Sequence, residues 1–383
     1  MLQSGLKKLI RMAITAAALG AFTCTAVQQS NVSPPGQPVE AERQEKRLFN
    51  QGEECASRKD YDCAILNYTQ AIELNPRHAE AFYKRARAYN KKGNFDQAIP
   101  DFDRAIELDP RLAEAFAYRG AAYGAKGEHD RLIKDSTKAI ALNPQLTDAY
   151  LNRAIAYATK GDYERAVSDF DKALELTPKS ADVYVQRGIT FMQKGTPDEA
   201  LSNFSRAIEL DPQLPEAYYQ RGLLYGSKGS TDQAISDFDK VIELNPQAAG
   251  AYYQRGVIYG SMSRHNLALR DADKAIEFDP QFAGAYVNRG TAYAQLGYTD
   301  QAIEAYSKAI ELDPKLSNAY FNRGVSYNNR RSYVEAVGDL NRAIELNPRD
   351  AMSYYYRALA YESLGRKPNA EADLREYKKL STK

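Results

Sequence analysis

Apolar, small and polar residues recur along the chain with a period of 34 residues. Each period begins with a large aromatic residue, a small residue and a second aromatic residue, spaced by four and three, as in Tyr218, Gly222 and Tyr225. A second group with the same spacing follows, and Phe238 is the aromatic residue at its centre. Because residues spaced by three and four share one face of an α-helix, each period predicts two amphipathic helices.

Prolines and glycines mark the boundaries of these helices. Glycines such as Gly93 and Gly229 separate the two helices of a period, and acidic residues such as Asp96 and Asp232 begin the second helix, where the helix dipole favours a carboxylate. The prolines recur at the same interval without an insertion, at Pro76, Pro110, Pro144, Pro178, Pro212, Pro246, Pro280, Pro314 and Pro348. With each proline counted as position 32, ten units run from residue 45 to the end of the chain.

This pattern closely resembles the tetratricopeptide repeat, which has large residues at positions 4, 11 and 24, small residues at 8, 20 and 27, and proline at 32. The resemblance covers about 340 of the 383 residues. It implies an all-α fold, a right-handed α-solenoid of about ten helix-turn-helix hairpins over residues 43–383. It also implies a scaffold that binds an extended segment of a protein partner in a concave groove.

An arginine occupies position 7 in most units, as at Arg187, Arg221, Arg255 and Arg289. Antiparallel helices pair positions whose numbers sum to about 31, so this arginine lies opposite position 23, which is usually aspartate. We interpret the series as structural, with each guanidinium bound to an acid or carbonyl of the second helix. The alternative is a row of ligand-binding charges.

The face of the first helix opposite the buried side is the candidate peptide-binding face. Side-chain amides occupy position 6 of six consecutive units, at Asn152, Gln186, Gln220, Gln254, Asn288 and Asn322. Aliphatic residues stand beside them at position 9, including Ile155, Ile189, Leu223 and Val257. Amides that both donate and accept suit the backbone of an extended peptide. The alternative is that they are solvated polar residues on an exposed helix.

Residues 1–26 are interpreted as an export signal, because basic residues precede a short apolar run rich in alanine and threonine. Cys24 is a possible lipidation site, although the residues before it match a lipobox poorly and cleavage after Ala26 fits about as well. Residues 27–42 contain three prolines among polar residues and are predicted to be a disordered tether. We therefore expect a periplasmic or envelope-associated protein, with secretion as an alternative. An uncleaved signal with a cytosolic array is the weaker alternative.

Cys55 and Cys63 fall at positions 11 and 19 of the first unit, so the hairpin brings them close together. An oxidising compartment would favour a disulfide between them. Alternatively, Cys55 fills the pocket of the position-11 tyrosine and Cys63 is incidental.

Charge and composition narrow the function further. The chain has 51 basic and 50 acidic residues, which argues against nucleic acid as its main partner. His78, His129 and His265 lie in three separate units without other ligands at a useful spacing, so we expect no metal, no cofactor and no enzymatic activity. Two classes of function remain, an adaptor for protein partners and a structural or self-assembling solenoid.

Overall fold

The structure is a computed structural model that describes residues 37–382. Within this range the chain forms twenty α-helices arranged as ten antiparallel hairpins, and it contains no β-strand. The first helices of the hairpins are α1 (Gln37–Ser57), α3 (Ala79–Lys91), α5 (Ala113–Ala125), α7 (Thr147–Thr159), α9 (Ala181–Lys194), α11 (Pro215–Ser227), α13 (Ala249–Ser261), α15 (Ala283–Gln295), α17 (Ser317–Asn329) and α19 (Ala351–Ser363).

The second helices are nearly uniform in length. They are α2 (Tyr61–Leu74), α4 (Phe95–Leu108), α6 (His129–Leu142), α8 (Tyr163–Leu176), α10 (Pro197–Leu210), α12 (Thr231–Leu244), α14 (His265–Phe278), α16 (Thr299–Leu312), α18 (Tyr333–Leu346) and α20 (Lys367–Ser381). The expected all-α solenoid of ten hairpins is confirmed.

Small residues at position 8 allow the two helices of a hairpin to pack closely. A Cβ atom added to Gly188 would lie 2.6 Å from a ring carbon of Phe204, and one added to Gly222 would lie 3.1 Å from the ring of Phe238. Both phenylalanines are fully buried. The alternation of small and aromatic residues seen in the sequence is therefore the contact between facing helices.

The turn inside each hairpin needs a left-handed residue. Gly93 and Gly229 adopt φ angles of 76° and 75° at this point, which a glycine adopts without steric cost. Three hairpins place a larger residue there, Lys59, Ser263 and Arg331, each also with positive φ. The first helix therefore ends where the sequence predicted.

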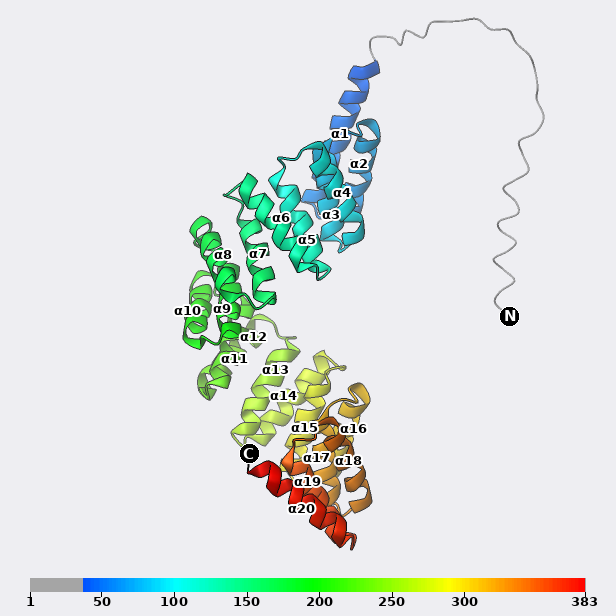
Figure 1. The fold of residues 1–383 in the computed structure, drawn as a ribbon, viewed down its shortest axis with the longest axis vertical. Coiled ribbons are helices and arrows are strands. Elements are labelled where there is room, and N and C mark those ends of the chain that lie inside the picture. Colours follow the sequence, from blue (N-terminus) through cyan, green and yellow to red (C-terminus); the bar gives the residue numbers. More distant parts are fainter. Residues whose placement is uncertain (1–36, 383) are drawn as a thin grey trace, which may run out of the picture.

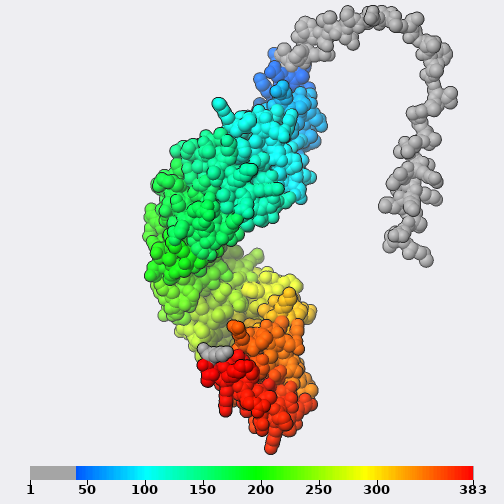
Figure 2. Space-filling model, in the orientation of Figure 1, coloured from blue at the N-terminus to red at the C-terminus, as the bar shows by residue number. Residues whose placement is uncertain are grey.

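The hairpins stack into an elongated, curved body (Figures 1 and 2). Each second helix packs against the first helix of the next hairpin, as α14 does against α15. Successive first helices also touch, as α5 and α7 or α13 and α15 do. The first helices therefore lie closer together than the second helices and form the inner side of the curve.

The predicted boundary of the tether at residue 42 is wrong, because α1 already begins at Gln37. Pro38 falls in the first turn of this helix, where its missing N–H has no intrahelical partner to lose. The residues that follow, such as Glu40 and Ala41, favour a helix. The rest of the predicted tether, the signal segment and Cys24 lie outside the described residues.

Candidate peptide-binding groove

Eight of the nine position-7 arginines each connect three helices. In the sixth hairpin Arg221 of α11 donates from Nε and Nη2 to the two carboxylate oxygens of Asp237 in α12, at 2.9 and 2.8 Å. Its Nη1 donates to Ser205 Oγ in α10 of the preceding hairpin, at 3.2 Å. Asp237 is buried, and the hydrogen bonds that its carboxylate accepts raise the pKa of the Arg221 guanidinium. This contact joins both helices of one hairpin to the hairpin before it.

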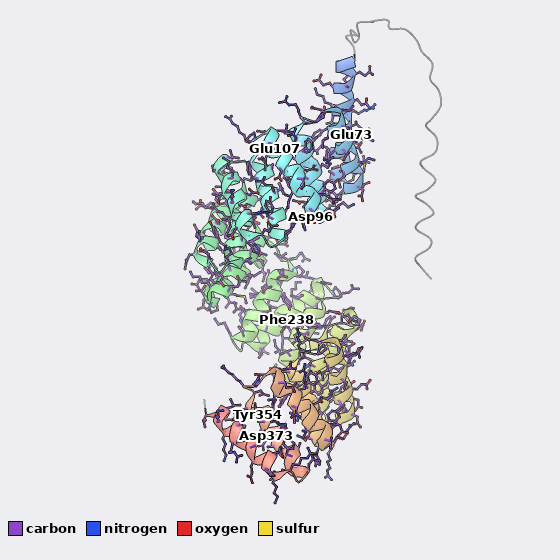
Figure 3. The ribbon with its side chains drawn as sticks, turned by 45° about the vertical axis from the view of Figure 1, so that its right-hand side comes forward. Glu73, Asp96, Glu107, Phe238, Tyr354 and Asp373 are labelled. Atoms are coloured by element: carbon purple, nitrogen blue, oxygen red, sulfur yellow. A yellow bond between two sulfur atoms is a disulfide. The ribbon has the colours of Figure 1, made fainter. Side chains whose placement is uncertain are left out.

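The same two-point contact with a position-23 aspartate recurs along the solenoid. The other pairs are Arg85–Asp101, Arg119–Asp135, Arg153–Asp169, Arg255–Asp271, Arg323–Asp339 and Arg357–Asp373. Figure 3 labels Asp373 on α20 and Tyr354 on α19, the two helices that Arg357 joins. Arg187 instead donates to the side-chain oxygen of Asn203, at 2.8 Å.

Arg289 is the exception among these residues. Alanine, Ala305, stands at position 23 of its hairpin, so the second helix offers no carboxylate at the position that pairs with the arginine. The nearest acid is Asp273 of the preceding hairpin, 3.7 Å from Arg289 Nη1, and Arg289 Nε is buried without a hydrogen-bond partner. Burial raises the pKa of the Asp273 carboxyl, whereas Arg289 lowers it less strongly. Arg289 therefore provides a natural comparison for the paired arginines.

The six position-6 amides lie on the inner side of the solenoid, but several also contact the protein itself. Asn152 Nδ2 donates to the Ala117 carbonyl of the preceding first helix at 3.3 Å, and Asn288 makes the equivalent bond to Tyr253 at 3.4 Å. Gln220 donates to Glu216 within its own helix, at 2.7 Å. The long bonds of the asparagines can be exchanged for bonds to a ligand at small cost.

Gln186 is exposed, and Asn322 is half-buried on the same face. The pKa of the Tyr219 hydroxyl is raised by burial and lowered less strongly by the nearby Gln254 side chain. The amides therefore form a row along consecutive first helices, and they differ in exposure and in the bonds that they make within the protein.

The aliphatic position-9 residues differ in exposure. Ile155 and Val257 each expose 42% of their surface to the inner side. Ile189 and Leu223 are half-buried and pack against the cores of their hairpins. Apolar contact with a ligand is therefore available mainly at Ile155 and Val257.

A charged pocket that the sequence did not predict lies at the N-terminal end of the inner side, between the first two hairpins. Lys84 donates to Glu53 at 2.5 Å. The Arg87 guanidinium lies 4.8 Å from the ring centre of Tyr118 and 5.6 Å from that of Tyr83. Basic residues at positions 6 and 9 were the sequence signal, since most later hairpins have an amide at position 6 and an aliphatic residue at position 9.

Cys55 and Cys63 form a disulfide that connects α1 to α2. Their Cα atoms lie 5.7 Å apart. The bridge closes the turn of the first hairpin, beside the charged pocket that Ala56, Ser57 and Tyr61 help to line.

Within residues 37–382, no group of three or more His, Cys, Asp or Glu residues is placed to hold a metal ion. His78 lies against Glu45, and His265 lies in another part of the solenoid. None of the helices that the structure describes has the length and apolar character needed to cross a bilayer.

The stacked helical hairpins and the small and aromatic residues between them define a helical-repeat solenoid. Four sequence models of the tetratricopeptide repeat match the chain. The first matches residues 79–112, 147–180 and 215–247, and the second matches residues 52–93, 190–229 and 292–329. The other two match residues 249–282 and 321–383. The chain belongs to the tetratricopeptide-repeat family.

Solved structures of other repeat proteins are similar to parts of the chain or to most of it. The MamA protein is 32% identical over 44% of this chain and 92% of its own, with a TM-score of 0.40. YrrB, described as a tetratricopeptide-repeat protein with an unusual peptide-binding site, is 26% identical over 51% of this chain and 97% of its own, with a TM-score of 0.42.

The Cut9–Hcn1 hetero-tetramer of the anaphase-promoting complex gives a TM-score of 0.52 at 17% identity, over 90% of this chain and 85% of its own. That likeness concerns the fold alone. No curated protein matches the chain.

Proposed function

We propose that this protein is a non-enzymatic scaffold that binds an extended segment of a protein partner along the inner side of its solenoid. The observation that supports the proposal most strongly is the row of position-6 amides on consecutive first helices. Their donors and acceptors suit a peptide backbone whatever its sequence.

The exposed aliphatic residues beside this row add apolar contact. Ile155 and Val257 expose more surface than most aliphatic residues of the described chain. They stand next to Asn152 and Gln254, three positions along the same helices. A peptide that hydrogen-bonds the amides would place some of its side chains on these aliphatic residues.

A crosslinking experiment tests where the partner binds. A photoreactive benzoylphenylalanine replaces either Gln186 on the inner side of α9 or Lys172, an exposed residue of α8. Irradiation in the native host should attach partner protein to the Gln186 variant and not to the Lys172 variant. Equal labelling from both positions would contradict binding along the inner side.

The alternative function is a self-assembling solenoid without a peptide ligand. The last helix, α20, carries Lys378 where the other second helices have Ile or Leu, and Lys379 where most of them have Glu. These charges favour a solvated end. Sedimentation velocity over a concentration series distinguishes the two, because the scaffold stays at one size and a self-assembling solenoid grows.

We also propose that the protein acts in the cell envelope, after export. The basis is the signal-like sequence of residues 1–26, and a disulfide between Cys55 and Cys63 agrees with an oxidising compartment. Fractionation followed by N-terminal sequencing should find the processed protein in the envelope. Recovery of the chain from the cytosol with Met1 intact would contradict export.

A further inference from the structure

A second pocket opens on the inner side, between α13, α15 and the start of α14. Its volume is about 450 Å³. Val257, Gly260 and Ser261 of α13 line one wall, Asn288 and Thr291 of α15 line the other, and His265 lies at the start of α14. The pocket therefore lies directly beside the row of amides.

Gly260 keeps this pocket open. A Cβ atom added to Gly260 would have no neighbouring atom within 4 Å, although the residue lies inside a helix, where glycine costs about 1 kcal/mol relative to alanine. Gly256, one turn earlier, differs because an added Cβ would lie 3.2 Å from that of Asp271. Close packing explains Gly256, whereas packing gives no reason for glycine at 260.

Three other hairpins fill the equivalent space with a larger side chain, whereas the remaining hairpins carry Gly, Ala or Glu at this repeat position. Asn90 and Asn328 hold the same repeat position as Gly260, and their side chains donate to carbonyls of the next hairpin, Tyr118 O at 3.1 Å and Tyr356 O at 2.9 Å. In the fifth hairpin Met192 stands there and packs against the core. Residues that reach across the gap are therefore compatible with the fold, and Gly260 leaves the gap empty.

The charge around this pocket differs from that of the charged pocket, which occupies the same place between the first two hairpins. Glu53, Lys84, Arg87 and Lys91 line the charged pocket. The pocket at Gly260 is lined by no Asp, Glu, Lys or Arg, and His265 is its one titratable side chain. A charged group placed there would lose hydration without gaining a counter-ion, so the lining favours an uncharged occupant.

We infer that the pocket at Gly260 receives a bulky uncharged side chain, aliphatic or aromatic, from the extended segment that the scaffold binds. This inference rests on the proposed function. It adds a preference for one type of side chain at one position of the bound segment. Val257 supplies an apolar surface for the side chain, and the amide of Asn288 lies in the opposite wall, within reach of the adjoining peptide backbone.

The experiment compares peptides selected by wild-type protein and by variants from a random-sequence peptide library. Gly260→Leu fills the pocket, and Gly260→Asn fills it with a residue that other hairpins accept. The matched control is Gly338→Leu. Gly338 is also helical and also free of neighbours within 4 Å, but it is an exposed residue of α18, at the repeat position where the first hairpin carries Leu66.

Peptides selected by the wild-type protein and by Gly338→Leu should be enriched in Leu, Ile, Met, Phe or Tyr at one position. The Gly260 variants should lose this enrichment and bind the wild-type-selected peptides on the order of tenfold more weakly, which corresponds to loss of one buried apolar side chain. If both Gly260 variants keep the wild-type enrichment and affinity, the inference about this pocket is wrong, whereas the proposed function still stands. A wild-type protein that selects no peptide would overturn the proposed function as well.

Discussion

At the scale of single residues, the paired arginines connect adjacent hairpins. Arg221 uses the planar fork of its guanidinium to bind both oxygens of Asp237 and still donates to Ser205 in the preceding hairpin. Lysine, with a single ammonium group, cannot reproduce this geometry. The Tyr218 ring lies 5.8 Å from the same guanidinium, so the charge is also held against an aromatic face.

Replacement of Arg221 by alanine should lower the free energy of unfolding by about 1–3 kcal/mol, because the buried carboxylate of Asp237 loses its partner. Arg289→Ala is the control and should have a smaller effect, since Ala305 leaves Arg289 without that carboxylate. Chemical denaturation of both variants measures the difference. Equal losses of stability in the two variants would show that the pairing of Arg221 with Asp237 does not stabilise the fold. A loss of partner binding by Arg221→Ala at unchanged stability would show that the arginine binds the partner.

At the scale of elements, the sequence predicts the features that lie within one hairpin, namely its two helices and the contacts between them. The spacing of Tyr218, Gly222 and Phe238 predicts both helices and their contact, because helical periodicity fixes which residues face each other. The opposition of Arg221 and Asp237 follows from the same antiparallel pairing. These features depend on local geometry, which repeats without change along the chain.

Features that depend on two hairpins are harder to predict. The bond from Arg221 to Ser205 depends on how the hairpins stack, and the pocket at Gly260 depends on what the next hairpin leaves unfilled. The start of α1 was placed too late because Pro38 can occupy the first turn of a helix. The hydrogen bonds from Asn152 and Asn288 to backbone carbonyls of the preceding first helix also could not be predicted from a single repeat.

The disulfide makes a prediction for the first hairpin. Reduction of Cys55–Cys63 should destabilise α1 and α2 by roughly 2 kcal/mol, because a short loop loses its crosslink at the end of the solenoid, where only one neighbour supports it. Hydrogen exchange with and without reductant measures this effect. Exchange in α17 and α18, which contain no cysteine, should stay unchanged and serves as the control.

Unchanged exchange in α1 and α2 after complete reduction would show that the crosslink adds no local stability. Free thiols at Cys55 and Cys63 in protein prepared from its host without reductant would show that the bridge does not form there.

At the scale of the whole molecule, stacking of ten hairpins turns isolated side chains into a continuous surface. No single hairpin buries its apolar face, so stability depends on contacts between neighbours. The inner side is charged near Lys84 and Arg87 and mainly neutral from Gln186 to Asn288. A bound segment would therefore meet different chemistry in the first hairpins and in the middle of the groove, and this difference would favour one direction of binding.

Peptide binding by a protein with Gln186, Gln220 and Gln254 all replaced by alanine directly tests whether the amide row binds the partner. These amides stand on α9, α11 and α13. Fluorescence anisotropy with a labelled peptide selected by the wild-type protein should show binding weaker by about tenfold or more, from the loss of several hydrogen bonds of about 0.5–1.5 kcal/mol each. Helix content by circular dichroism should stay the same.

The control replaces Arg206, Lys240 and Lys274, which stand on the second helices of the same three hairpins and form surface ion pairs. Their replacement by alanine should leave peptide affinity at the wild-type value. If the amide row binds the partner, the amide variant alone loses affinity and keeps its helix content. Wild-type affinity in the amide variant would contradict binding of the partner along this face.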